Sequence, residues 1–416
     1  MHREVWRNRH FRRLWLGTLA VRLGVQVGII ALTWLVLKTT GSGTKIGLVL
    51  ALYAAGDMLA SPWVGVLLDR VPRKLMLNLD NVLQAGIFVA LAVLYVAHQL
   101  PLGLLIALAV VSGGLSPLAY LGRMIVLPNV VEAGEWESAN TLMQINMNVV
   151  TLLGPALGGV LVAALGVPWT LMLTSGAYLV YFVALWGIPR DRFRAESQDH
   201  VAGTFLRDMV SGWTFLRRVP LLLVLVVVTL LFSLTYGPLE PALPVLVHSV
   251  FHGGPRVLGA LWSSFAVGAL VGTLAWGRLR PSWPLRIVVS TIIMSWGLFS
   301  GAIGLTRHAW VAAVLLALGG LTYAPYNILF SLWRQRLVPD SLRGRVFGAI
   351  NGITGLGLPL GQALGGFLIG AMGSRATVAV GGIACIVVGV GAMARASLWR
   401  GSEDSAGTDA AQSIGG

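Results

Sequence analysis

The sequence predicts an all-α integral membrane protein of twelve transmembrane helices, arranged as two related six-helix halves. Three observations predict it: an apolar composition, twelve apolar runs of membrane-spanning length, and an internal repeat. The apolar residue types AVILMFWYC make up 56% of the 416 residues and charged residues only 11%, whereas soluble domains carry about 25% charged residues. Such a chain cannot cover a surface that faces water, which excludes a soluble enzyme.

The apolar runs are long enough to span a bilayer, because about 20 helical residues cross its hydrocarbon core. One long polar connection, 189–220, separates six runs from six, and apolar residues at helical spacing in it predict an amphipathic helix on the membrane surface. This division gives halves 1–188 and 221–396 and a tail, 397–416, that we expect to be disordered. The predicted spans are 14–37, 46–68, 75–97, 102–127, 139–165, 168–188, 221–245, 257–279, 285–305, 309–333, 345–371 and 376–396.

The positive charge of the chain predicts its orientation. A formal net charge of +14 would suggest nucleic-acid binding in a soluble protein. In a membrane protein the positive-inside rule accounts for it, so we expect no nucleic-acid partner. With the N-terminus in the cytoplasm, the inner segments hold 23 of the 30 Lys and Arg residues and the outer segments hold five. The bias predicts a multi-pass protein of the bacterial cytoplasmic membrane, in contact with its lipids and with both termini inside.

An internal repeat relates the two halves. Residues Gly154–Gly166 of the fifth predicted span align without gaps to Gly361–Gly373 of the eleventh, and eight of the 13 positions are identical. Both segments occupy the same place in their six-span half and run in the same direction. Two parallel halves with a site between them are typical of transporters.

The loop after the second span reads Gly65-Val-Leu-Leu-Asp69-Arg70-Val-Pro-Arg73-Lys74. It resembles the signature loop of the major facilitator superfamily, with Pro72 where glycine is usual. Other stretches resemble its macrolide-efflux and enterobactin-exporter branch: Leu127-Pro128, Ala139-Asn140, Gly154-Pro155, Gly158-Gly159, Gln335-Arg336 and Leu342-Arg343-Gly344-Arg345. The resemblance runs from Arg7 to about residue 395. It implies two bundles that expose a central cavity alternately to each side, and proton-driven export of small amphipathic compounds.

The signature loop also has a physical interpretation of its own. Asp69 can accept hydrogen bonds from a helix N-terminus or an arginine, and the nearby cations can contact lipid headgroups and helix C-termini. Such contacts would form in one conformation and break in the other, as a cytoplasmic gate latch requires; the alternative is ordinary positive-inside charge. The candidate latch residues are Gly65, Asp69, Arg70, Arg73, Lys74 and, as support near the inner end of the third span, Asp80.

Asp57 lies in the middle of the second span, where a charge costs at least ~2.5–3.5 kcal/mol. Arg22 and Gln26 share one face of the first span at a matching depth, so we predict an Arg22–Asp57 ion pair facing a cavity. A carboxylate that exchanges such a partner for a proton or a cationic substrate could couple transport to protons, whereas a static pair would only join two helices. Glu240, near the outer end of the seventh span, is either a second titrating group or a solvated residue at the mouth.

Polar stripes within the spans predict the lining of a cavity, since polar groups in lipid must face protein or water. The small-residue faces of the repeat are interpreted as helix-packing seams, with a bend at Pro155. The predicted lining residues are Tyr53, Asn140, Gln144, Asn148, Thr151, Tyr323, Tyr326 and Asn327, and the packing residues are Gly154, Pro155, Gly158, Gly159, Gly361 and Gly365.

No residue pattern indicates an enzyme, a metal site or a cofactor. The chain has one cysteine, Cys385, and no G-x-x-x-x-G-K-[ST] loop, so it carries no ATP-binding motor of this type. We therefore expect a monomeric secondary transporter that exports amphipathic or cationic small molecules in exchange for protons. A lysophospholipid flippase or nutrient importer of the same fold stays open, as does a membrane-embedded transferase or a scaffold.

Overall fold

The computed structural model describes residues 2–193, 205–279, 283–339, 342–395 and 399, and no strand occurs among them. They form two compact units: Met1–Asp199 with Val247–Ser263, and His200–Leu246 with Ser264–Gly416. The predicted boundaries of the two halves stay a prediction, and the predicted tail lies outside the described residues except for Trp399. The helices up to the middle of the chain are α1 (His2–Arg7), α2 (Arg9–Thr40), α3 (Gly43–Arg70), α4 (Arg73–Val96), α5 (Leu102–Val130), η1 (Ala133–Glu135), α6 (Trp136–Trp186) and η2 (Arg190–Phe193). The later helices are α7 (Phe205–Arg218), α8 (Pro220–Tyr236), α9 (Leu239–Ser249), α10 (Pro255–Leu279), α11 (Leu285–Ile303), α12 (Ala309–Leu337), α13 (Arg343–Thr354) and α14 (Gly357–Ala394).

The helices match the predicted spans. Among the described residues, nine helical segments are long and apolar enough to cross a membrane, and Leu102–Leu118 is a shorter apolar one. Two of the nine, Trp136–Trp186 and Arg343–Ala394, have 51 and 52 residues, enough for two crossings each. The all-α membrane fold and its twelve crossings are therefore confirmed.

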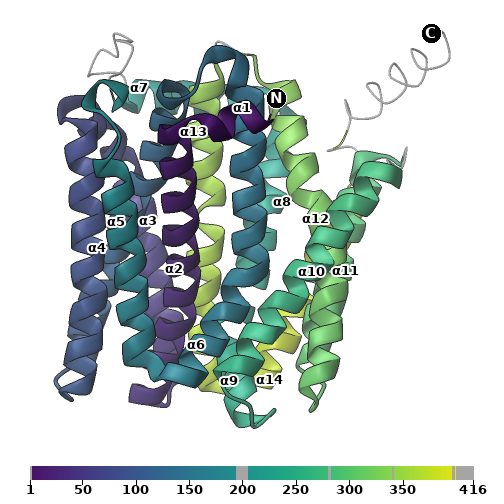
Figure 1. The fold of residues 1–416 in the computed structure, drawn as a ribbon. Helices are drawn as coiled ribbons and strands as arrows, with labels where there is room; N and C mark the ends of the chain where they lie inside the picture. The colour runs from purple at the N-terminus through teal and green to yellow at the C-terminus, as the bar shows by residue number, and fades with distance from the viewer. Residues whose placement is uncertain (1, 194–204, 280–282, 340–341, 396–398, 400–416) are drawn as a thin grey trace. The chain divides into compact units, whose positions relative to one another are not determined.

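In the first unit, α2 packs along both halves of the long helix α6. Glycines on α2 allow this: a Cβ added to Gly24 would lie 2.6 Å from the Cβ of Ala177, and one added to Gly28 would lie 3.0 Å from Cγ2 of Thr174. From the side of α6, a Cβ on Gly154 would lie 2.7 Å from the Cβ of Gln26. Figure 1 shows the long helices of this unit running roughly parallel, with the short α1 across one end.

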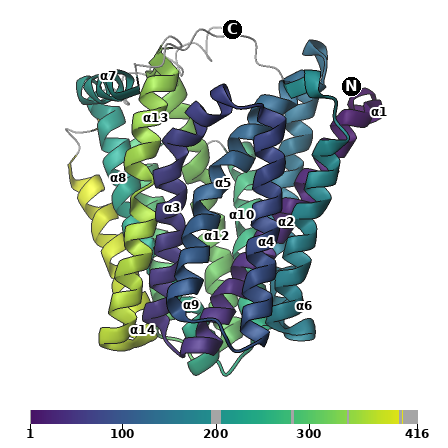
Figure 2. The same ribbon diagram turned by 90° about the vertical axis from the view of Figure 1, so that its left-hand side faces the viewer.

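In the second unit, the predicted amphipathic helix is present as α7. Its Leu216 is fully buried in a cluster with Val346 and Ile350 of α13 and with residues of α8. Gly212 also faces α13, because a Cβ there would meet the carbonyl oxygen of Arg345. Figure 2 shows α7 lying across the ends of α8 and α13. The apolar face of α7 is thus covered by protein at this end, and the side chains of residues 205–211 lie outside the description.

The two units repeat the same internal geometry. The last glycine of the sequence repeat adopts a positive φ in both units, with φ/ψ of 80°/170° at Gly166 and 80°/165° at Gly373. Only glycine takes this conformation without strain, and it turns each long helix from one crossing to the next. The bend expected at Pro155 is not a break in α6, whose one non-helical residue is Gly166.

A second pair of seams strengthens this match. On α5, a Cβ added to Gly113 would collide with the carbonyl oxygen of Tyr53 on α3, and on α12 one added to Gly320 would collide with that of Phe265 on α10. Gly113 and Gly320 are as far apart in the sequence as Gly154 and Gly361. Equivalent helices therefore touch through equivalent glycines in both units.

We expect alanine at either seam glycine to lower stability. Gly113→Ala and Gly320→Ala each place a methyl group against a backbone carbonyl, which costs about 1–3 kcal/mol. The matched control is Gly86→Ala on exposed α4 surface, where no atom lies within 4 Å of the added Cβ. Thermal unfolding of the purified protein in detergent should show a lower Tm for both seam variants than for the control. Equal Tm values in all three variants would contradict the packing described.

Candidate functional site

Asp57 lies beside the seam between α3 and α5. Its neighbour Gly56 faces α5, where a Cβ would lie 2.5 Å from the carbonyl oxygen of Val110. One turn earlier, the Tyr53 hydroxyl and the Ser116 hydroxyl are 2.9 Å apart and share a hydrogen bond. Because consecutive helical residues point about 100° apart, Asp57 projects to the side of this seam, and its side chain is half-buried.

The ion pair between Arg22 and Asp57 stays a prediction. Both side chains are half-buried within their helices. At the glycine contacts, α2 packs on α6 and the glycine face of α3 packs on α5. Sequence neighbours are thus not the main packing partners here. Gln26 lies at the α2–α6 contact, against Gly154.

A buried polar face on α4 continues from this seam. The Gln84 side chain donates to the carbonyl oxygen of Ser112 at 2.9 Å and accepts from the Ser112 hydroxyl at 2.7 Å. Asn81 donates to the Leu77 carbonyl oxygen at 2.6 Å. Asp80, predicted to support the signature loop, is buried with 1% of its surface exposed. The polar groups of α3, α4 and α5 therefore form one continuous region within the first unit.

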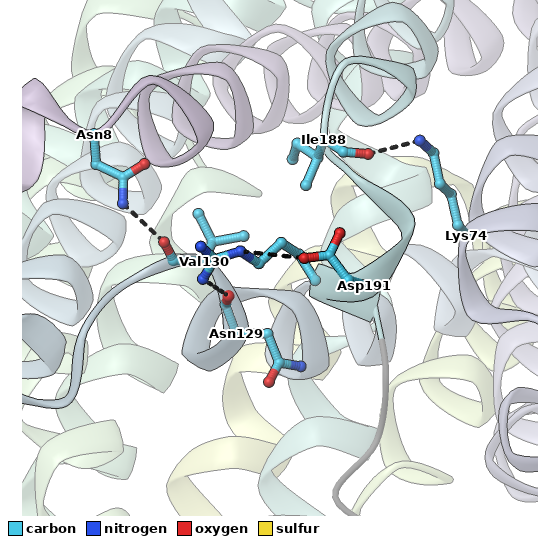
Figure 3. Close-up of polar contacts among 7 residues, drawn as sticks. Asn8, Lys74, Asn129, Val130, Ile188 and Asp191 are labelled. Carbon is cyan, nitrogen blue, oxygen red and sulfur yellow. Dashed lines mark hydrogen bonds and ion pairs between the residues drawn. The ribbon is translucent and has the colours of Figure 1, made fainter.

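In the signature loop, the structure describes only part of the predicted latch. The side chains of Asp69 and Arg70 and the surroundings of Gly65 lie outside the description, and Arg73 is half-buried at the start of α4. Lys74 donates to the carbonyl oxygen of Trp186 at 2.8 Å, at the C-terminal end of α6. It also donates to that of Ile188 at 2.6 Å (Figure 3). Its ammonium lies 5.8 Å from the Trp186 ring centroid. A cation is favoured at a helix C-terminus, and the latch role itself stays a prediction.

Other polar side chains donate hydrogen bonds to backbone carbonyls at the same end of the first unit. Asn8 donates to the carbonyl oxygen of Val130 at 2.8 Å, and Arg192 donates to that of Asn129 at 3.0 Å, at the end of α5 (Figure 3). Arg192 also lies 3.9 Å from Asp191, an exposed contact of small energetic value. These bonds satisfy carbonyl groups that the helix ends leave without a partner.

The predicted polar stripe on α6 faces accessible space. Asn140, Gln144, Asn148 and Thr151 are all exposed, whereas Asn146 on another face is fully buried and donates to the carbonyl oxygen of Trp15. Within the stripe, Gln144 donates to the Asn148 side chain at 3.2 Å. An exposed polar stripe on an apolar helix is compatible with a water-lined path, and its role stays a prediction.

In the second unit, Glu240 is held by a partner that the sequence analysis did not consider. Gln362 of α14, 4% exposed, donates through Nε2 to Glu240 Oε2 at 2.6 Å. Gln362 occupies the position in the repeat that Pro155 occupies in the first unit. The other four differences within the repeat are between apolar residues, so the polar Gln362 could have been noticed in the sequence. Glu240 itself, in the first turn of α9, is half-buried.

The second unit also holds an aromatic cluster, and only two of its members, Tyr323 and Tyr326, belong to the predicted lining. Of the predicted residues, Tyr326 is buried and its hydroxyl lies 2.6 Å from that of Thr229, Tyr323 is half-buried and Asn327 is exposed. The rings come from four helices of this unit and lie 5.2–6.4 Å apart. The cluster consists of Phe232, Tyr236, Phe265, Trp296, Tyr323 and Tyr326.

Two repeated helical units with polar groups and carboxylates inside apolar spans define a multi-pass membrane transporter. Residues 5–412 match the family described as transmembrane secretion effectors, so the chain belongs to this family of the major facilitator superfamily. The resemblance found in the sequence is thereby confirmed.

Individual relatives and a solved structure agree with this assignment. The chain is 25% identical to the multidrug efflux pump Tap of Mycolicibacterium fortuitum over 90% of this chain and 92% of that protein. It is 26% identical to the enterobactin exporter EntS of Citrobacter koseri over 90% of this chain and 86% of that protein. A bacterial homologue of the iron transporter ferroportin, solved in an inward-facing state, shares the fold with a TM-score of 0.72 at 16% identity, covering 94% of this chain and 99% of that one.

We expect the C-terminal end of α6 to become less stable when the hydrogen bonds from Lys74 are removed. Lys74→Met keeps most of the length of the unbranched side chain but removes the donor to the Trp186 and Ile188 carbonyls. Hydrogen–deuterium exchange of peptides covering residues 183–193 should become about threefold to tenfold faster, because charged hydrogen bonds contribute about 1.5–3 kcal/mol and exposure reduces this. Lys38→Met, at an exposed position on α2, is the control. Unchanged exchange in Lys74→Met would show that these bonds do not hold the end of α6.

Proposed function

We propose that this chain is a secondary active efflux transporter, which exports amphipathic or cationic small molecules by alternating access in exchange for protons. The observation that carries the proposal is a pair of matching helical units, each with a half-buried carboxylate in an apolar helix: Asp57 in one and Glu240 in the other. The names of the relatives, a multidrug efflux pump and an enterobactin exporter, support export as the direction.

Protons are the proposed driving ion. The sequence has no G-x-x-x-x-G-K-[ST] loop for ATP, so the energy for export must come from another source such as an ion gradient. A charged carboxylate within a span costs at least ~2.5–3.5 kcal/mol, and binding a proton removes that cost. Asp57 would therefore hold a proton when water is excluded from its side of α3 and release it when water enters. This binding and release of a proton by Asp57 would couple the conformation around Asp57 to the proton gradient.

The proposal also covers the orientation of the chain, the latch and the oligomeric state. We place both termini on the cytoplasmic side of the bacterial cell membrane, because that orientation puts most Lys and Arg inside. Asp69 and the basic residues after it would then lie at the inner face, where they form the latch and contact anionic lipids. Lys74 shows how such a cation can hold a helix end within one unit. A single copy of the chain carries both units, so we propose a monomer.

We expect Asp57→Asn to uncouple transport from protons. In everted membrane vesicles, the wild-type protein should accumulate a cationic probe, ethidium, and a neutral one, N-phenylnaphthylamine, when the interior is acid, and a protonophore should abolish this. Asp57→Asn should reduce gradient-driven accumulation by about tenfold or more, because asparagine cannot carry a proton. Exchange of probe across the membrane without a gradient should remain.

Glu137→Gln is the matched control, because Glu137 is an exposed carboxylate in the first turn of α6. It should accumulate both probes like the wild type. Full gradient-driven accumulation by Asp57→Asn would refute Asp57 as the proton carrier. If the wild-type protein moved neither probe in everted vesicles but took up solutes in right-side-out vesicles, the chain would be an importer.

A further inference from the structure

At one end of the second unit, two arginines lie over aromatic rings. In the last turn of α7, the guanidinium carbon of Arg217 lies 5.0 Å from the centroid of the Trp213 ring. In the last turn of α12, that of Arg334 lies 4.8 Å from the Phe347 ring of α13 and 5.8 Å from the Phe330 ring. A ring face orients a guanidinium without neutralising its charge. Both cations therefore keep a full positive charge for an anion from outside.

The two cations border the same apolar cluster. Leu216, the residue before Arg217, is fully buried in it together with Val346 of α13. Phe330 and Phe347, the rings beneath the second arginine, pack against this cluster as well. In Figure 2, α7 crosses the end of α13. The last turns of α7 and α12 and the first turn of α13 thus meet at one end of the second unit.

The first turn of α13 adds backbone donors to this place. Its N-cap residue, Leu342, provides no side-chain acceptor for the first N–H groups. Arg343, Gly344 and Arg345 are exposed, and no described atom lies within 4 Å of a Cβ added to Gly344. A helix N-terminus carries a partial positive charge and favours an anion. The turn is therefore open to a ligand, and it favours a negatively charged one.

Few acidic side chains are available to balance these charges. Of the residues that the structure describes in this unit, only Asp208 and Glu240 are acidic, and Asp340 lies outside them. Glu240 follows the far end of α8, whose 17 residues span about 25 Å. Meanwhile Nε of Arg334 is buried and has no hydrogen-bond partner among the described residues. Buried donors rarely remain so, and an anionic oxygen is the partner that a guanidinium prefers.

The exposed ring of α7 favours a lipid over a dissolved anion. Trp213 exposes 38% of its surface, although α7 lies directly beside the ends of apolar spans. Indole rings prefer the headgroup level of a bilayer, because one edge is polar and the rest is apolar. The apolar face of α7 is already covered by α13 and α8. The face that remains for the membrane therefore combines an arginine with an interfacial ring.

We propose that the last turns of α7 and α12 and the first turn of α13 bind the phosphate group of an anionic phospholipid. Arg217 and Arg334 supply the charge, the start of α13 supplies N–H donors, and Trp213 lies at the level of the glycerol groups. This inference rests on the proposed function for its orientation, which places the site in the cytoplasmic leaflet. The bound lipid holds the polar face of α7 at the membrane surface, while α13 holds the apolar face.

Equilibrium binding of radiolabelled phosphatidylglycerol to the full-length protein, immobilised in a nonionic detergent, tests the site without requiring transport. Wild type should bind it saturably, and excess phosphatidylcholine or inorganic phosphate should not displace it. Arg217→Gln and Arg334→Gln should each weaken binding by about fivefold, because each removes one cation near the headgroup. Arg217→Lys keeps the charge and should bind within about twofold of wild type. Gel filtration should show that every variant is folded.

Arg307→Gln is the matched control, because Arg307 is an exposed arginine just before α12, at the opposite end of this helix from Arg334. It should bind the lipid like wild type. If Arg334→Gln did not fold, Arg217→Gln, at an exposed position, would decide. Unchanged affinity in Arg217→Gln, or displacement of the lipid by inorganic phosphate, would overturn the proposed site.

The vesicle assay separates this inference from the proposed function. If wild type accumulated both probes but bound phosphatidylglycerol no better than phosphatidylcholine, only the lipid site would fail. If wild type bound phosphatidylglycerol through Arg217 but moved no probe in either kind of vesicle, only the proposed function would fail.

Discussion

The close approach of helix backbones at glycine is the constraint on which the rest of this structure depends. Lipid gives little hydrophobic drive for one apolar helix to pack on another, so association relies on tight contact between small residues. Gly113 against Tyr53 and Gly320 against Phe265 make this contact in the two units, and a methyl group at either glycine would meet a carbonyl oxygen. The fold is repeated because its seams are repeated.

These seams also determine where the chemistry-bearing side chains lie. Gly56 turns one face of α3 towards α5, and its neighbour Asp57 is thereby held beside the contact and not in it. In the second unit Gly361 packs against Gly237, and this approach brings Gln362 within hydrogen-bonding distance of Glu240. Each carboxylate thus lies next to a tight contact between two helix backbones.

Much of the fold could be predicted from the sequence, because span length and small-residue repeats are local properties. The twelve crossings, the amphipathic α7 and the repeat ending at Gly166 and Gly373 all follow from such patterns. The predicted Arg22–Asp57 pair assumes that consecutive spans pack together, whereas the glycine contacts join α2 to α6 and α3 to α5. The aromatic cluster was missed because its rings come from four helices, and nothing local marks Trp296 as a neighbour of Tyr323. The position of a residue along its helix can be predicted from the sequence. Which other helix packs against that residue depends on the tertiary structure.

An experimental density map of the protein in lipid nanodiscs tests the central claim most directly. We expect α3 to touch α5 at Gly113 and α10 to touch α12 at Gly320, with backbone against backbone in both places. We also expect a positive φ at Gly166 and at Gly373. A layer of side chains separating either helix pair, or a bend at one of the two glycines and not at the other, would contradict it.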